Sequence, residues 1–276
     1  MLNAVILAAG RSGDDFGRTF GTVHKCLVKV AGRSMIHWVL DALRGASSVD
    51  RVVVVGPEGP LRSAGVKAQL VHQDGGAYTD SLHAGVGSVS GDKVLVIAAD
   101  VPLLLVEGLD EYVTDCLASG ADVCFPAVSW EAMQARFPGA RKTWYDLRDG
   151  KLTKGNAVIG PRDFFLTQLS RIEGLFESRK KKRWAGLICQ QFMRRLLARA
   201  ASQADVEAML SSYLRVRLKA VPADPSLAVD VDEVPDVAFV EAVLRQRVAD
   251  SRTAVIPPML LRESTQVRET FVAAVH

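Results

Sequence analysis

The sequence lacks paired cysteines. Its 276 residues include four cysteines, and none of them stands in a C-x-x-C pair: Cys26, Cys116, Cys124 and Cys189. This spacing excludes the common zinc-binding patterns and a disulfide framework. Single, scattered cysteines are typical of proteins in a reducing compartment, so we expect a cytoplasmic protein.

Long hydrophobic runs and a strong charge of one sign are also missing. The longest apolar stretch, Val94 to Val106, is interrupted by Asp100 and Pro102 and is too short to span a bilayer. The chain begins directly with a predicted strand, without a basic region before an apolar one, so we expect no signal peptide. A formal net charge of +3 is too small to indicate nucleic-acid binding, and we predict no nucleic-acid partner.

Hydrophobic residues make up 49% of the chain, which is enough for a sizeable core. In the first half, apolar runs typical of strands alternate with amphipathic segments typical of helices. The predicted strands are Val5–Ala8, Arg51–Gly56, Gln69–His72, Lys93–Asp100 and Asp122–Phe125; the predicted helices are Ser34–Leu43, Thr79–Val89 and Leu105–Leu117. This alternation predicts an α/β fold, a three-layer and mostly parallel sheet with helices on both faces.

The pattern changes after Pro126. Trp144–Thr153 resembles a hairpin with an Asp-Gly turn, and Lys154–Pro161 then returns toward the sheet. Further on we expect a mostly helical segment with a helix start at Ser202, two extended segments and a last helix: Phe164–Ser212, Tyr213–Val221, Leu227–Asp232 and Val237–Val248. We predict one domain over residues 1–250, with a helical insertion at about 162–212, and a C-terminal extension over 251–276.

A glycine-bearing loop follows the first strand and ends in a lysine, Lys25. Loops at the carboxyl ends of strands bind ligands in open α/β sheets. Glycines let backbone N–H groups approach anionic oxygens, and Lys25 adds a charge that can reach phosphate. The spacing fits neither G-x-G-x-x-G nor G-x-x-x-x-G-K-[ST]. The alternative is an ordinary surface loop that is rich in glycine.

Carboxylates at two other places suggest a metal site. Asp100 ends the most apolar predicted strand, where an ionised carboxylate is costly unless it is paired or binds a metal. In the extended segment Asp230-Val231-Asp232, both aspartates are expected on one face. Mg²⁺ prefers one or two carboxylates together with substrate phosphates, and Asp100 with Asp232 meets that demand. The alternatives are a turn cap at Asp100 and a helix-capping acidic segment at Asp230–Asp236.

Taken together, four segments resemble the nucleotidyltransferase superfamily, specifically its molybdenum cofactor guanylyltransferase-like NTP transferase domain: Ile6–Gly10, Lys25–Ile36, Ala99–Pro102 and Val229–Asp236. The resemblance covers the chain up to about Val248 and implies the nucleotide-diphospho-sugar transferase fold. It implies a nucleotide-binding role for Leu7, Ala8, Ala9, Gly10, Arg11, Lys25, Gly75, Gly76 and Thr79. It also implies that Lys25 and Asp100 are catalytic, that Asp100 and Asp232 bind Mg²⁺, and that Lys154 and Asn156 lie on the acceptor side.

The implied reaction moves a nucleoside monophosphate from an NTP to a small phosphorylated acceptor, with release of pyrophosphate. Two other function classes stay open. A metal-dependent glycosyltransferase that uses a sugar nucleotide would share the Asp-x-Asp segment and the metal. A non-catalytic nucleotide-binding regulator would share the fold, because fold does not establish turnover.

Three features depart from the family's usual pattern. The segment Arg11–His24 is longer than the compact loop, Ser34 stands where proline is frequent, and Phe164–Ser212 has no counterpart in compact members. Within that last segment, the basic run Arg179–Arg183 suggests either a peripheral membrane contact or a solvated basic helix face.

Overall fold

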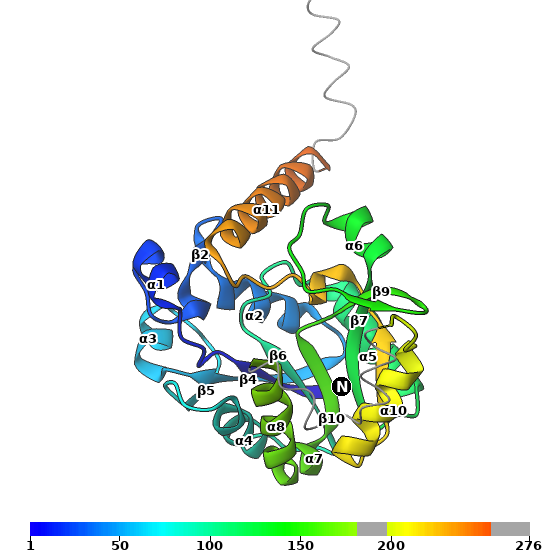
Figure 1. Ribbon diagram of the computed structural model, residues 1–276. Coiled ribbons are helices and arrows are strands. Elements are labelled where there is room, and N and C mark those ends of the chain that lie inside the picture. Colours follow the sequence, from blue (N-terminus) through cyan, green and yellow to red (C-terminus); the bar gives the residue numbers. More distant parts are fainter. Residues whose placement is uncertain (181–197, 255–276) are drawn as a thin grey trace, which may run out of the picture.

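The computed structural model describes residues 1–180 and 198–254 (Figure 1). In this part of the chain nine strands form one sheet, in the order β5-β4-β1-β6-β10-β7-β9-β8, with β11 paired to β7. The strands are β1 (Leu2–Leu7), β4 (Val49–Gly56), β5 (Gln69–His72), β6 (Lys93–Ala98), β7 (Val123–Ser129), β8 (Tyr145–Leu147), β9 (Gly150–Lys154), β10 (Ala157–Pro161) and β11 (Leu218–Pro222). A small separate hairpin joins β2 (Lys29–Val30) to β3 (Arg33–Ser34).

Most strands of the large sheet share one direction. β1 is parallel to β4 and β6, β4 is parallel to β5, and β7 is parallel to β11. β10 is antiparallel to both β6 and β7, and β9 is antiparallel to β7 and β8. Among the described strands of this sheet, β9 and β10 are therefore the two that run against the others, which confirms the mostly parallel arrangement.

Helices cover both faces of the sheet. They are α1 (Asp14–Phe20), α2 (Met35–Gly45), α3 (Glu58–Ser63), α4 (Tyr78–Gly87), α5 (Val106–Ala118), α6 (Trp130–Arg136), α7 (Arg162–Thr167), α8 (Leu169–Lys180), α10 (Gln203–Leu214) and α11 (Val234–Ala254), with short 3₁₀ turns η1 (Lys25–Leu27) and η3 (Pro225–Leu227). In the view of Figure 1, α2 lies above the sheet and α4 and α8 lie below it. None of the helices in the described ranges is long and apolar enough to cross a bilayer.

The alternation of side chains along β1 explains the three layers. Successive side chains on a strand point to opposite faces. Ala4 and Ile6 are buried with side chains of α2 and α5, whereas Val5 is buried with side chains of α4, α7 and α8. Because all three β1 positions are apolar, the strand is stable only with helices on both of its faces. The predicted three-layer α/β fold is therefore confirmed.

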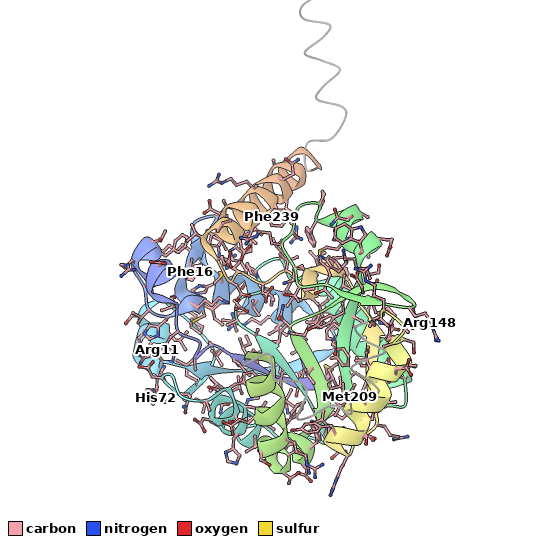
Figure 2. The ribbon with its side chains drawn as sticks, in the orientation of Figure 1. Arg11, Phe16, His72, Arg148, Met209 and Phe239 are labelled. Carbon is pink, nitrogen blue, oxygen red and sulfur yellow. The ribbon has the colours of Figure 1, made fainter. Side chains whose placement is uncertain are left out.

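A third hydrophobic cluster lies at the edge of the sheet where the parallel strands have their carboxyl ends. It joins side chains of α6 and α11 to the segment before α11, and Phe16 of α1 is buried in it. Phe239 of α11 packs against the same cluster (Figure 2). This cluster fixes the glycine-bearing loop and the late acidic segment against the same part of the core.

The second half of the chain differs from the sequence prediction in two places. Tyr213 and Leu214, expected in a strand, belong to α10, because that helix continues until Arg215 adopts a left-handed conformation (φ +55°). Leu227–Asp232, expected as extended, contains the end of η3 and forms no strand. The predicted hairpin is present as β8 and β9, and Ser202 starts α10 with a reciprocal hydrogen-bonding pattern with Asp205.

The helices α7 and α8 and all but the last two residues of α10 fall in the predicted insertion at 162–212. The assignment of that segment as an insertion and the division at residue 250, which falls within α11, stay predictions. The basic run Arg179–Arg183 starts at the end of α8; Lys181–Arg183 and the side chains of the run lie outside the described residues, as does the predicted membrane contact.

Candidate nucleotide site

The loop after β1 leaves the sheet and returns to its starting point. The N–H of Ser12 donates to the carbonyl oxygen of Val23 at 2.9 Å, and Arg11 pairs with His24 in an isolated β-bridge. The N–H of Lys25 then donates to the carbonyl oxygen of Gly10 at 3.2 Å. The two ends of the long Arg11–His24 segment, which contains α1, therefore lie side by side. This arrangement places Lys25 directly beside Gly10.

Lys25 meets two carboxylates from distant parts of the chain. Its Nζ lies 2.5 Å from Oδ2 of Asp100, just after β6, and 2.5 Å from Oδ1 of Asp232, just before α11. The backbone brings the two acidic segments together, since the N–H of Val231 donates to the carbonyl oxygen of Asp100 at 3.0 Å. The expected convergence of the amino-terminal loop with both acidic segments is therefore present.

The charges in this cluster influence one another strongly. Burial of Lys25 works to lower its pKa, but the carboxylates of Asp100 and Asp232 outweigh burial and the pKa is raised overall. Burial raises the pKa of Asp100; Lys25 opposes that change, while Asp230 and Asp232 add to it. Lys25 is consequently a cation at neutral pH and holds a group of carboxylates that would otherwise repel one another.

Asp230 and Asp232 have different partners. Asp230 forms an ion pair with Lys142, whereas Asp232 pairs with Lys25. Val229 and Val231, on either side of Asp230, are buried, so the predicted alternation of buried and polar positions is correct although the segment is not a strand. Sequence reasoning missed Lys142, which lies in an irregular segment without a motif.

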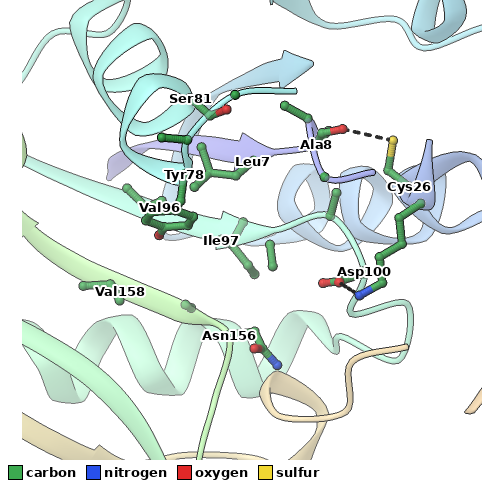
Figure 3. A pocket seen from close by; sticks show the side chains of 18 of the residues that line it. Leu7, Ala8, Cys26, Tyr78, Ser81, Val96, Ile97, Asp100, Asn156 and Val158 are labelled. Atoms are coloured by element: carbon green, nitrogen blue, oxygen red, sulfur yellow. Dashed lines mark hydrogen bonds and ion pairs between the residues drawn. The ribbon is translucent and has the colours of Figure 1, made fainter. Parts of the chain in front are cut away.

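A cavity of about 400 Å³ lies beside this cluster (Figure 3). Ten of the predicted site residues line it: Leu7, Ala8, Ala9, Gly10, Lys25, Gly75, Gly76, Asp100, Lys154 and Asn156. Tyr78 and Ser81 of α4 and Cys26 also line it; of these three, Ser81 and Cys26 were not predicted. Asp232 lines an adjoining cavity instead, and Arg11 and Thr79 are not among the lining residues.

Arg11 lies beside the cavity and joins two of the loops that form it. Its guanidinium pairs with Asp74 at 3.0 Å, next to Gly75. Gly75 and Gly76 have φ values of +77° and +86°, a left-handed conformation that favours glycine over other residues. Thr79, the second residue of α4, is buried. The direct nucleotide contacts expected for Arg11 and Thr79 stay predictions.

Asn156 presents a hydrogen-bonding group to the cavity. It lies between β9 and β10, where its N–H donates to Leu227 and its carbonyl oxygen accepts from Ala98, so the backbone is held at both sides. Its side-chain Nδ2 is buried and has no hydrogen-bond partner within the described residues. A buried donor without a partner is costly, which makes a bound ligand the natural acceptor for it. Figure 3 shows Asn156 and Val158 of β10 across the cavity from α4.

A second polar cavity of about 320 Å³ adjoins the first one. Lys154 and Asn156 line both, and the second cavity adds Arg141, Lys142 and Asp232. Lys154 and Asn156, the two residues expected on the acceptor side, therefore lie where the two cavities adjoin.

The arrangement of Asp100 and Asp232 can be compared with the needs of Mg²⁺. Within the described residues, no group of three or more His, Cys, Asp or Glu side chains could hold a metal ion. Asp100 and Asp232 nevertheless place one oxygen each within 2.5 Å of a common point, Nζ of Lys25. Two carboxylates suit an ion that takes its remaining ligands from substrate phosphates and water, so this donor set fits Mg²⁺.

Two known proteins are similar to this chain in sequence. The chain is 29% identical over 166 residues to a "Probable molybdenum cofactor guanylyltransferase" of Thermococcus gammatolerans, covering 58% of this chain and 79% of that protein. It is 33% identical over 173 residues to the "Bifunctional protein GlmU" of Azorhizobium caulinodans, covering 59% of this chain. The match spans only 34% of that longer protein.

A solved structure described as a hypothetical transferase from Thermus thermophilus superimposes with a TM-score of 0.75 and 31% identity. The superposition covers 86% of this chain and 100% of that one. The structural matches confirm the nucleotide-diphospho-sugar transferase fold that the sequence predicts.

The MobA-like NTP transferase domain matches residues 4–212, which include the glycine-bearing loop, Asp100, Lys154 and Asn156. With more than half of its length covered by that match, the chain belongs to the MobA-like NTP transferase domain family.

Proposed function

We propose that the protein transfers a nucleoside monophosphate from an NTP to a phosphorylated acceptor and releases pyrophosphate. The observation that carries the proposal is the contact of Lys25 with both Asp100 and Asp232 beside a cavity of about 400 Å³. The cation can offset charge on a triphosphate, and the two carboxylates can hold the Mg²⁺ that accompanies it. Membership of the family favours this chemistry over other nucleotide-dependent reactions.

Phosphoryl chemistry requires positioning and charge neutralisation more than covalent help. The backbone of Ala8, Ala9 and Gly10 would receive the nucleotide, with Gly75 and Gly76 on the opposite loop. Lys25 would exchange one of its carboxylate partners for a phosphate oxygen of the triphosphate. Mg²⁺, held by Asp100 and Asp232, would neutralise charge on the phosphates.

The acceptor would approach from the side of Lys154 and Asn156. Its phosphate oxygen attacks the α-phosphorus, a new P–O–P bond forms, and the bond from the α-phosphorus to the bridging oxygen breaks as pyrophosphate leaves. The buried Nδ2 of Asn156 can donate to either substrate, and Lys154 offsets the charge of the incoming phosphate.

The test measures NTP binding and pyrophosphate release with each of the four nucleoside triphosphates, Mg²⁺ and a panel of phosphate monoesters. Asp100→Asn is expected to reduce turnover by about a hundredfold while the protein stays folded, because one electrostatic contact in a site of this kind contributes about 3 kcal/mol. Asp115→Asn, on the exposed side of α5, is the matched control and should be fully active.

Other outcomes would point to other functions. Full activity of Asp100→Asn would remove Asp100 from the site. Hydrolysis or transfer from a sugar nucleotide alone would indicate a glycosyltransferase, and nucleotide binding without turnover across the whole panel would indicate a regulator.

A further inference from the structure

A cavity of about 370 Å³ with almost wholly apolar walls lies next to the candidate site. Side chains of the sheet and of the helices α7, α8 and α10 form these walls, among them Phe125, Leu152, Phe164, Val206, Met209 and Leu210. Several of these side chains are only half-buried, so the cavity is accessible from the surface. Its volume falls within the range of small-molecule sites.

Two polar side chains in these walls, Gln203 and Thr153, already have partners within the protein. Nε2 of Gln203 donates to Glu207 at 2.9 Å and to the carbonyl oxygen of Ala220 at 3.0 Å. Thr153 Oγ1 donates to the carbonyl oxygen of Thr143 at 2.9 Å. A cavity that offers few free hydrogen-bonding groups favours an apolar occupant over water.

The apolar cavity continues into the candidate nucleotide site. Tyr78, Gly155, Ala157 and Val158 line both spaces. Lys154 lines all three cavities: the nucleotide cavity, the second polar cavity and the apolar one. A molecule with its phosphate near Lys154 would therefore have an apolar space beside it.

We propose that the phosphorylated acceptor is amphiphilic: a phosphate monoester of an apolar alcohol, with its phosphate at Lys154 and its carbon body in the apolar cavity. This inference rests on the proposed function and adds the chemical class of the acceptor. It also assigns a role to α7, α8 and α10, which supply one wall of the acceptor site. The transfer step is unchanged, with the acceptor phosphate attacking the α-phosphorus and pyrophosphate leaving.

The test is a titration of the full chain with butyl, hexyl and octyl phosphate, after its affinity for NTP and Mg²⁺ has been measured separately. Each methylene moved from water into an apolar cavity strengthens binding, so octyl phosphate should bind at least about tenfold more tightly than butyl phosphate. Product formation should follow the same order. If NTP does not bind, the proposed function fails; if NTP binds but alkyl length has no effect, the present inference fails alone.

Variants of α10 locate the alkyl chain. Met209 of α10 lines the apolar cavity (Figure 2), whereas the neighbouring Ala208 is exposed. Met209→Glu should reduce octyl phosphate affinity at least about tenfold and leave NTP affinity unchanged, because the charge opposes an apolar occupant. Ala208→Glu, with the same added charge outside the cavity, should bind octyl phosphate like the unmodified protein.

NTP affinity reports whether each variant is folded. If Met209→Glu does not bind NTP, the milder Met209→Gln takes its place, with a smaller loss of octyl phosphate affinity expected. Undiminished octyl phosphate binding in a folded Met209 variant would place the alkyl chain outside this cavity and overturn the proposal.

Discussion

The amino group of Lys25 lies 2.5 Å from a carboxylate oxygen of Asp100, and both side chains are about four-fifths buried. Oδ1 of Asp232 lies 2.5 Å from the same amino group. The three residues follow β1, follow β6 and precede α11, so one cation connects three distant parts of the chain.

Replacing Lys25 by methionine should lower the free energy of unfolding by about 3 kcal/mol, because the buried Asp100 carboxylate would lose its partner. Millimolar Mg²⁺ should then raise the unfolding temperature of Lys25→Met more than that of the unmodified protein, because the lysine no longer competes for the two carboxylates. Thermal unfolding with and without Mg²⁺ measures both effects. The exposed Lys29→Met is the control, and equal Mg²⁺ effects in all three proteins would contradict a shared cation site.

Asn156→Ala should lower activity without lowering stability. Removing a buried donor that has no partner in the described residues should leave stability unchanged or raise it by about 1 kcal/mol. Nucleotidyl transfer should fall, since the substrate loses a hydrogen bond. Unfolding curves and steady-state kinetics on the same preparation test this. A variant that is less stable but fully active would show that Asn156 has a structural role.

Cys26 should react slowly with thiol reagents although it lines the candidate nucleotide cavity. Burial, reinforced by Asp100, raises the pKa of this thiol to about 12, and the thiol donates to the carbonyl oxygen of Ala8 at 3.4 Å. Because the thiolate is the reactive form, alkylation at pH 8 should be on the order of a thousandfold slower than in the unfolded chain. Mass spectrometry of the Cys26 peptide gives the rate. Comparable rates in the folded and unfolded protein would refute the burial of this group.

Asp110 should contribute to stability in a pH-dependent way. Partial burial works to raise its pKa, but hydrogen bonds from the backbone and hydroxyl groups of Ser47 and Ser48 outweigh it and lower the pKa to about 2. A lowered carboxyl pKa means that the contribution is complete above the unfolded value near 4 and is lost as pH falls toward 2. Asp110→Asn should therefore unfold more easily at pH 7, and its difference from the unmodified protein should shrink between pH 4 and pH 2.

Chemical denaturation across this pH range measures that difference, with the exposed Asp50→Asn as control. A constant difference between the two proteins at every pH would mean that ionisation of Asp110 makes no contribution.

Most strands of the large sheet and the longer helices in the first half of the chain were predictable because each carries a local pattern, whereas the short helices α1, α3 and α6 were not predicted. α2 is an example: Met35, Ile36, Val39, Leu40 and Leu43 recur at helical spacing, and all five are buried. The predictions of extended structure at Tyr213 and at Leu227–Asp232 were wrong because an extended pattern does not specify a strand partner. The latter segment is held instead by single contacts, such as the hydrogen bond from Val231 to Asp100.

The candidate site was predictable where residues belong to motifs. Lys25, Asp100 and Asp232 were expected together and lie together. Lys142 belongs to no motif, and its position depends on how an irregular loop packs. The apolar cavity was beyond sequence reasoning altogether, since its lining runs from Tyr78 to Ala220 and exists only after those segments assemble.

The antiparallel direction of β10 has a consequence for how the acceptor preference of such a protein can change. Because β10 is antiparallel to β6, with Ala157 opposite Ile97, residues that precede β10 arrive at the same edge as residues that follow β6. The proposed nucleotide-binding groups thus follow strands, whereas Asn156 lies just ahead of β10 and Lys154 ends β9. The β8–β9 hairpin that precedes β10 can change in length or composition without moving the loops that follow β1 and β6, so acceptor preference can change separately from the proposed triphosphate contacts.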